Sequence, residues 1–181
     1  MIWVIGGCAA FLPLYVFDLL KMRRSGGKTG LFFALGYGGI FVCTMGVLFQ
    51  NGFMLKQWGW LLPGGAAFLM MTGALFFALP FSKTYVKAET NQVVDVGLYA
   101  LCRHPGVLFF ALMYFFLWLA CGRVTMLVAM FLWTAMDVLH VWVQDRWLFP
   151  KTLEGYGQYQ QTTPFLIPTA ASFHRCLKTL G

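Results

Sequence analysis

Arginine, histidine and proline follow one another at Arg103, His104 and Pro105, directly before a run of apolar residues. Proline suits the first turn of a helix because its missing N–H would have no partner there. The free amides of that turn attract an anion such as a carboxylate or phosphate. Arg103 adds a fixed positive charge, and His104 adds a group that titrates near neutral pH. The segment is therefore a candidate anion-binding site.

The same residue types are also typical of a membrane interface. If the segment before Arg103 is helical, Tyr99 lies four residues earlier on the same face. Arginine and histidine bind lipid phosphates, and tyrosine is common in the aromatic belt at the level of the headgroups. The local sequence leaves both interpretations open.

A second group of polar residues, Asp137, His140 and Gln144, interrupts an apolar run further along the chain. Spacings of three and four place all three on one face of a helix. An ionised aspartate inside a membrane helix costs about 3 kcal/mol or more, so Asp137 should face a partner or a polar cavity. These residues either form an interhelical hydrogen bond that holds a bundle together or belong to a chemical site.

The segment that follows carries Tyr156 and Tyr159 and ends with Pro164 and Pro168. The tyrosine spacing predicts a short amphipathic helix, and the prolines predict an extended strip that returns to the membrane. The alternative for this segment is a simple surface anchor.

The elements that position these residues are predicted to be membrane-spanning helices. Of the 181 residues, 60% are hydrophobic and 10% are charged, and the mean hydropathy is +0.71. Soluble domains have about 25% charged residues, so an ordinary soluble enzyme and a disordered chain are excluded. The sequence predicts an all-α integral membrane protein with five transmembrane helices, at 2–20, 31–49, 58–81, 107–121 and 124–143. Only Gly122 and Arg123 separate the last two, which predicts a tight antiparallel hairpin.

The distribution of basic residues predicts the orientation of these helices. With the N-terminus outside, the outer turns hold Lys56 and Arg123. The cytosolic segments then hold Lys21, Arg23, Arg24, Lys28, Lys83, Lys87, Arg103, Arg146, Lys151, Arg175 and Lys178. This positive-inside bias predicts a cytosolic C-terminus. It also explains the net charge of +7 without a nucleic-acid partner.

The chain is interpreted as one membrane domain, 1–181. A three-helix part covers 1–81, and a part with the helical hairpin and the cytosolic polar segments covers 82–181. The five cysteines are scattered without a metal-binding spacing, so no metal site is predicted.

Taken together, the two polar segments resemble the isoprenylcysteine carboxyl methyltransferase and phospholipid methyltransferase superfamily of integral membrane methyltransferases. The first part of the family pattern, Gly-x-Tyr-x-x-x-Arg-His-Pro, is matched by Gly97, Tyr99, Arg103, His104 and Pro105. A hairpin, acidic residues, Tyr-x-x-Tyr and a final proline follow in the family, and they are matched by Asp145, Tyr156, Tyr159, Pro164 and Pro168. The resemblance covers about residues 83–168. The family's tyrosine and glycine after His-Pro are replaced here.

The resemblance implies S-adenosylmethionine-dependent methyl transfer to a lipid or lipophilic small-molecule acceptor at the cytosolic membrane face. It implies a cofactor site made of Gly97, Tyr99, Arg103, His104, Pro105, Asp145, Tyr156 and Tyr159. In this interpretation Arg103 meets the cofactor's carboxylate, Asp145 and His104 meet its ribose or amino group, and a tyrosine face meets its sulfonium. The candidate catalytic residues are Asp137, His140 and Arg146. Asp137 or His140 takes a proton if the acceptor must lose one.

Two alternatives remain open. One is a membrane reductase of the steroid-reductase type that uses NADPH, and the other is a non-catalytic membrane scaffold or pseudoenzyme. The expected location is a bacterial inner membrane or the endoplasmic reticulum. The sequence predicts neither the acceptor nor the oligomeric state.

Overall fold

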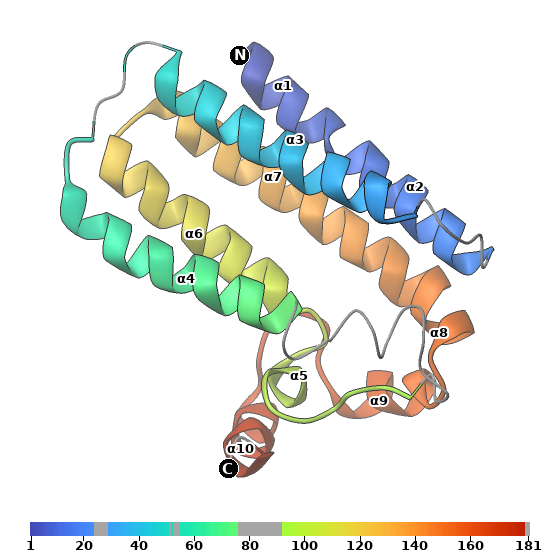
Figure 1. The fold of residues 1–181 in the computed structure, drawn as a ribbon. Coiled ribbons are helices and arrows are strands. Elements are labelled where there is room, and N and C mark those ends of the chain that lie inside the picture. The colour runs from blue at the N-terminus through green and yellow to red at the C-terminus, as the bar shows by residue number, and fades with distance from the viewer. Residues whose placement is uncertain (24–28, 51, 53–54, 76–91, 180–181) are drawn as a thin grey trace.

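The structure is a computed structural model that describes residues 1–23, 29–50, 52, 55–75 and 92–179. Within these residues the regular elements are helices, apart from an isolated bridge between Gln92 and Glu154. The longer helices lie side by side as a bundle, and the two termini lie at opposite ends of the molecule (Figure 1). The predicted all-α class is confirmed.

The bundle contains two groups of helices. In the first group, α1 (Ile2–Ala9) and α2 (Phe11–Met22) form one rod, which packs against α3 (Thr29–Phe49) and α7 (Val124–Val143). In the second group, α4 (Leu61–Gly73) packs along α6 (Pro105–Cys121). A short 3-10 turn, η1 (Trp58–Trp60), precedes α4. The helical hairpin of α6 and α7 joins the two groups.

The helices coincide with the apolar runs of the sequence. Among the described residues, three stretches are long and apolar enough to cross a membrane, namely Ile2–Met22, Thr29–Phe49 and Val124–Thr152. Pro105–Cys121 is a shorter apolar helix. The predicted end of the third run, at residue 81, lies outside the described residues. These apolar helices are consistent with a membrane protein.

The tight turn between α6 and α7 is confirmed, and Gly122 makes it possible. This glycine has a φ of +64°, a left-handed conformation that side chains disfavour. Its N–H donates to the Trp118 carbonyl oxygen at 2.7 Å, which closes the last turn of α6. Arg123 then donates to the carbonyl oxygens of Val47 and Leu48 at the end of α3. The tip of the hairpin is thereby joined to the first group of helices.

Trp133 locks α7 to α1 in the centre of the bundle. Its side chain is fully buried, and its Nε1 donates to the Val4 carbonyl oxygen at 2.9 Å. Gly7 makes room for it, since a Cβ at Gly7 would lie 2.3 Å from the indole ring. A second buried contact, between the Tyr114 and Thr44 hydroxyl groups at 2.7 Å, joins α6 to α3.

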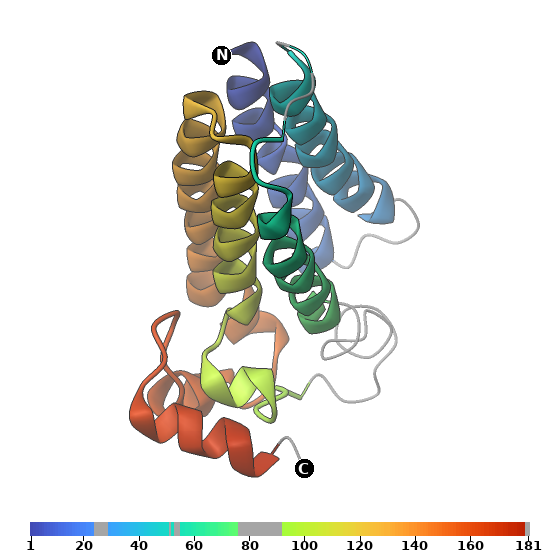
Figure 2. The same cartoon turned by 90° about the vertical axis from the view of Figure 1, so that its left-hand side faces the viewer.

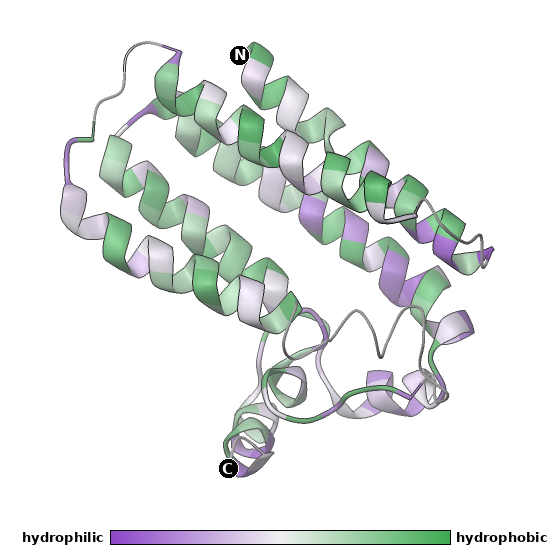
Figure 3. Ribbon diagram, in the orientation of Figure 1, coloured by the Kyte–Doolittle hydropathy of each residue, from purple (hydrophilic) through white to green (hydrophobic). Residues whose placement is uncertain are grey.

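Short helices form a cap at the end of the bundle that lies away from the N-terminus (Figure 2). They are α5 (Leu98–Leu101), a π turn η4 (Gln144–Leu148), α8 (Phe149–Thr152), α9 (Tyr156–Thr162) and α10 (Ala170–Thr179). Hydrophilic residues gather in this cap and in the adjoining half of α7, whereas the bundle is mainly hydrophobic (Figure 3).

The predicted short helix after Tyr156 is confirmed as α9, whereas α10 was not predicted. Ser172 and Cys176, four residues apart, form its buried face. Thr169 and Ser172 cap its start, since each backbone N–H donates to the other residue's hydroxyl group. This reciprocal pair satisfies amides that a helix start leaves free.

Candidate functional site

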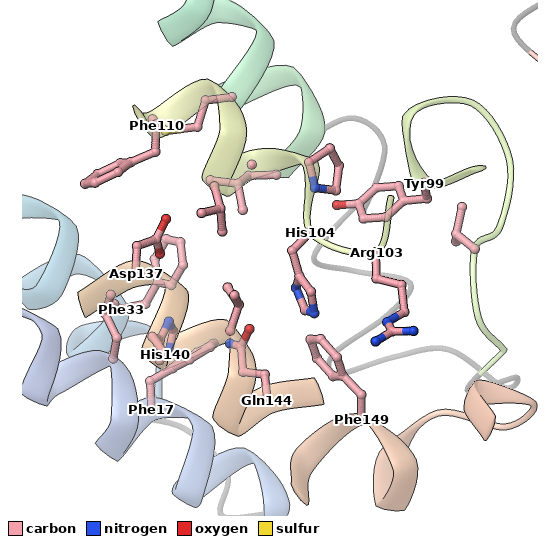
Figure 4. Close-up of a pocket in the computed structure, with 18 of the residues that line it drawn as sticks. Phe17, Phe33, Tyr99, Arg103, His104, Phe110, Asp137, His140, Gln144 and Phe149 are labelled. Atoms are coloured by element: carbon pink, nitrogen blue, oxygen red, sulfur yellow. The ribbon is translucent and has the colours of Figure 1, made fainter. Parts of the chain in front are cut away.

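A cavity lies in the half of the bundle next to the cap, and the two polar groups noted in the sequence both line it (Figure 4). Tyr99 and the segment Arg103–Pro105 line one side, and Asp137, His140 and Gln144 line the other. Most of the remaining wall is apolar or aromatic, with Phe11, Leu14, Phe17, Phe33, Ile40, Met71, Leu75, Val107, Phe110 and Phe149. An apolar cavity with a few converging polar groups is typical of a small-molecule site.

Arg103 and Asp145 form a buried ion pair beside this cavity. Arg103 Nε donates to Asp145 Oδ1 at 2.9 Å, and its Nη2 donates to Oδ2 at 3.1 Å. The exposed fractions of the two side chains are 11% and 6%. The third guanidinium nitrogen, Nη1, donates to the carbonyl oxygens of Gln160 and Thr163 at 2.8 and 2.9 Å. Arg103 therefore fastens α9 to the start of α6.

Asp145 is held by other donors as well. His104 Nε2 lies 3.2 Å from Oδ1, and the Tyr156 hydroxyl donates to the same oxygen at 2.6 Å. Gln160 Nε2 donates to Oδ2 at 3.1 Å. Asp145 is not among the residues that line the cavity. In this structure its oxygen atoms bind protein groups, and the carboxylate orients the residues in front of it.

The helical spacing considered for Tyr99 and Arg103 does not occur. Helix α5 ends at Leu101, and Cys102 is extended, with φ −158° and ψ 162°. The Tyr99 hydroxyl instead donates to the Ala74 carbonyl oxygen at 3.1 Å. The Tyr159 hydroxyl donates to the Tyr99 carbonyl oxygen at 2.7 Å, so two residues of the cavity wall are joined by a hydrogen bond.

Gly97 and Pro105 mark the two ends of the segment that carries these residues. Gly97 has a φ of +60°, and its N–H donates to the Thr179 hydroxyl group of α10 at 2.9 Å. Pro105 is the first residue of α6, as its place in the sequence predicts. Gly97 therefore allows the turn of the backbone before α5 and is not a lining residue, whereas Pro105 contributes to the cavity wall.

His104 is buried between aromatic rings. The Phe149 ring is stacked on it at a centroid distance of 5.9 Å, and the Phe165 ring lies edge-on at 5.1 Å. Asp145 is ionised by its pairing with Arg103, so the proton of His104 lies on Nε2. Nδ1 has no hydrogen-bond partner among the described residues. Burial lowers the pKa of His104 below its ordinary value of 6.5, although Asp145 acts in the opposite direction.

This shift predicts a loss of stability in mild acid. The unfolded chain takes up a proton at His104 below pH 6.5, but the folded protein resists it, so the free energy of unfolding falls as the pH drops below 6.5. Thermal unfolding, followed by tryptophan fluorescence between pH 7.5 and 5, measures the slope. His104→Gln keeps a donor for Asp145 without titrating, so its slope is expected to be shallower. Equal slopes in both proteins would contradict this role of His104.

The opposite side of the cavity contains a residue that the sequence analysis missed. His140 Nε2 lies 2.9 Å from Asp18 Oδ2, and Gln144 Nε2 donates to the same oxygen at 2.9 Å. Asp18 is buried, and its other oxygen, Oδ1, has no hydrogen-bond partner in the described part of the chain. The signal for Asp18 was a lone acidic residue within the first apolar run.

The three predicted catalytic residues have different positions. Asp137 and His140 line the cavity, as their shared helical face predicts. Asp137 has no hydrogen bond or ion pair to any described residue. Arg146 is exposed and is absent from the cavity wall. It lies within the π turn that continues α7.

The chain matches no family model, no curated protein and no solved structure. The cavity offers an apolar interior, several aromatic faces, a carboxylate that pairs with none of the described residues and two histidines that each bind an aspartate.

Proposed function

We propose that this protein transfers a methyl group from S-adenosylmethionine to a lipid or lipophilic acceptor at the cytosolic membrane face. The observation that carries the proposal is the cavity shared by the Arg103–Pro105 segment and the Asp137–Gln144 face of α7 (Figure 4). The first of these segments belongs to the residues that resemble a family of membrane methyltransferases, and so do Tyr156 and Tyr159, which also line the cavity.

The proposal includes a position in the membrane. The five apolar segments predicted from the sequence cross it with the N-terminus outside and the cap in the cytosol, in a bacterial inner membrane or the endoplasmic reticulum. Support comes from the cap, which contains Arg103, Arg146, Lys151, Arg175 and Lys178. Lys56 and Arg123 lie at the other end, beside the loop between α6 and α7. This asymmetry agrees with the positive-inside rule.

The residues present suit the proposed cofactor. When bound, it supplies an electrophilic methyl group on a positively charged sulfur atom. The aromatic faces of Tyr99 and Phe149 line the cavity and favour such a cation. His104 presents Nδ1, a hydrogen-bond acceptor, on the same side. The apolar wall excludes water, and holding two reactants in line is the main contribution that methyl transfer needs from a protein.

The lining also supports a lipophilic acceptor. The cavity wall includes three phenylalanines from α2 and α3 that are far from Arg103 in the sequence, namely Phe11, Phe17 and Phe33. A long apolar chain gains about 25 cal/mol for each Å² of its surface that such a wall removes from water. A small polar acceptor gains little there, so the wall favours a molecule that arrives from the bilayer.

Binding of S-adenosylhomocysteine to the detergent-purified protein tests the proposal. Calorimetry is expected to show micromolar binding of this ligand and no binding of NADPH. His104→Gln is expected to weaken binding about tenfold, the effect of one hydrogen bond, and the exposed Glu154→Gln is expected to leave it unchanged. Binding of NADPH alone would support a reductase instead, and binding of neither ligand would overturn the proposal.

A further inference from the structure

Asp18, His140 and Gln144 form a buried cluster that joins α2 to the end of α7. Asp18 Oδ2 accepts from Gln144 Nε2 and contacts His140 Nε2, both at 2.9 Å. Asp18 and His140 are both buried, and His140 lines the cavity. The pair therefore resembles a carboxylate that holds an imidazole at a site, although Asp18 was outside every residue set predicted from the sequence.

The contacts define the protonation of His140. Gln144 can only donate through Nε2, so Asp18 Oδ2 is the acceptor in this cluster. The proton of His140 consequently lies on Nε2. Its Nδ1 keeps a lone pair and has no hydrogen-bond partner among the described residues. An imidazole oriented in this way offers the Nδ1 lone pair to a proton donor.

Asp137 lies three residues before His140 on the same face and also lines the cavity. Its carboxylate has no hydrogen bond or ion pair to any described residue. The cation on the opposite wall, Arg103, is already paired with Asp145. When Asp137 is ionised, this end of the cavity carries a negative charge that a bound cation would offset and that would repel a bound carboxylate.

We propose that Asp18 is a positioning residue that holds His140 as the proton acceptor, and that the methyl acceptor is a lipophilic amine whose ammonium group pairs with Asp137. The proposal rests on the methyl transfer proposed above. An amine fits both features of this end of the cavity, because it arrives with a positive charge and with a proton to lose. A carboxylate acceptor has neither.

The proposed step balances. The ammonium group gives one proton to His140 Nδ1, and the nitrogen becomes neutral with a free electron pair. That pair forms a bond to the methyl carbon while the bond from this carbon to sulfur breaks, and its electrons stay on sulfur. The products are a methylated ammonium group, a neutral thioether and a protonated His140, which then releases its proton.

The first experiment tests the tautomer, independently of any activity. In ¹⁵N-histidine NMR spectra of the full chain in detergent, His140 is expected to carry its proton on Nε2 with Nδ1 unprotonated. In Asp18→Asn both His140 tautomers are expected to be populated, whereas in Asp18→Glu the tautomer with its proton on Nε2 is expected to predominate again. The wild-type spectrum alone is decisive if Asp18→Asn fails to fold. A proton on Nδ1 in the wild-type protein would overturn the proposal.

The second experiment tests the acceptor. The protein is placed in phosphatidylcholine vesicles that contain octadecylamine or octadecanoate. S-adenosylmethionine with a labelled methyl group is then added. We expect label in the amine and none in the carboxylate. In Asp18→Asn, kcat is expected to fall about 100-fold or more, with the affinity for S-adenosylhomocysteine and the KM for the amine unchanged. Glu154→Gln serves as the matched loss of an exposed charge and is expected to keep the wild-type rate.

These outcomes separate the two proposals. If S-adenosylhomocysteine binds but only the carboxylate is methylated, or neither probe is, the amine assignment is wrong while the methyltransferase proposal stands. If kcat is unchanged in Asp18→Asn, Asp18 does not position a base. If S-adenosylhomocysteine does not bind at all, the proposed function fails, and the tautomer of His140 still decides whether Asp18 orients it.

Discussion

Replacing Arg103 by alanine is expected to lower the free energy of unfolding by about 3–5 kcal/mol, because it leaves a buried charge without its partner. Asp145 is 6% exposed and accepts two hydrogen bonds from this guanidinium. Lysine at position 103 is not expected to rescue the loss, since it cannot donate to Asp145 and to the carbonyl oxygens of Gln160 and Thr163 together. Thermal unfolding in detergent measures the change.

Limited proteolysis locates the effect of Arg103→Ala. Cleavage is expected between α9 and α10 in the variant, because Arg103 joins α9 to the start of α6. The exposed neighbour Arg146→Ala is the control and is expected to change stability by less than about 0.5 kcal/mol. In the double variant Arg103→Leu with Asp145→Leu, the free energy of unfolding is expected to fall by less than the sum of the decreases in the two single variants. A loss below about 1 kcal/mol in Arg103→Ala would contradict this role of the ion pair.

Trp133→Ala is expected to cost about 3–5 kcal/mol, the range for removing a large aromatic side chain from a core. The side chain has no exposed surface, and its Nε1 donates to the Val4 carbonyl oxygen, which would lose that partner. Trp142→Ala in the same helix is the matched control, because Trp142 is 41% exposed. Equal losses in the two variants would contradict the proposed lock between α7 and α1.

Trp133→Ala is also expected to affect the cavity. Trp133 holds α7 against the rod of α1 and α2, and the contact between His140 and Asp18 joins the same two elements further along. Trp133→Ala is therefore expected to loosen the position of His140 relative to Asp18. The His140 tautomer, measured by NMR, reports this without any activity assay.

Much of the fold could be predicted because membrane helices follow apolar runs. The runs placed α3, α6 and α7 within a few residues, and the pair Gly122 and Arg123 predicted the hairpin. Helix α10 was missed because its periodic signal is a short pattern in a polar segment, where only Ser172 and Cys176 are buried.

The site could be predicted only where it depends on local spacing. Asp137, His140 and Gln144 share one helix, so their common face follows from helical geometry. Asp18 pairs with His140 across 122 residues, and no local pattern indicates such a contact. Tyr99 and Arg103 do not share a helix face, as considered from their spacing, because the extended conformation of Cys102 ends the helix between them.

The contacts of Asp145 also determine when the site can form during synthesis. The carboxylate is part of α7's continuation, but its partners Tyr156 and Gln160 follow it by 11 and 15 residues. When Asp145 leaves the ribosome, Arg103 is already present and α9 is not. The wall of the cavity that contains Tyr156 and Tyr159 is therefore completed only after every long helix has been made. A nascent chain can therefore form its long helices before this cavity is complete.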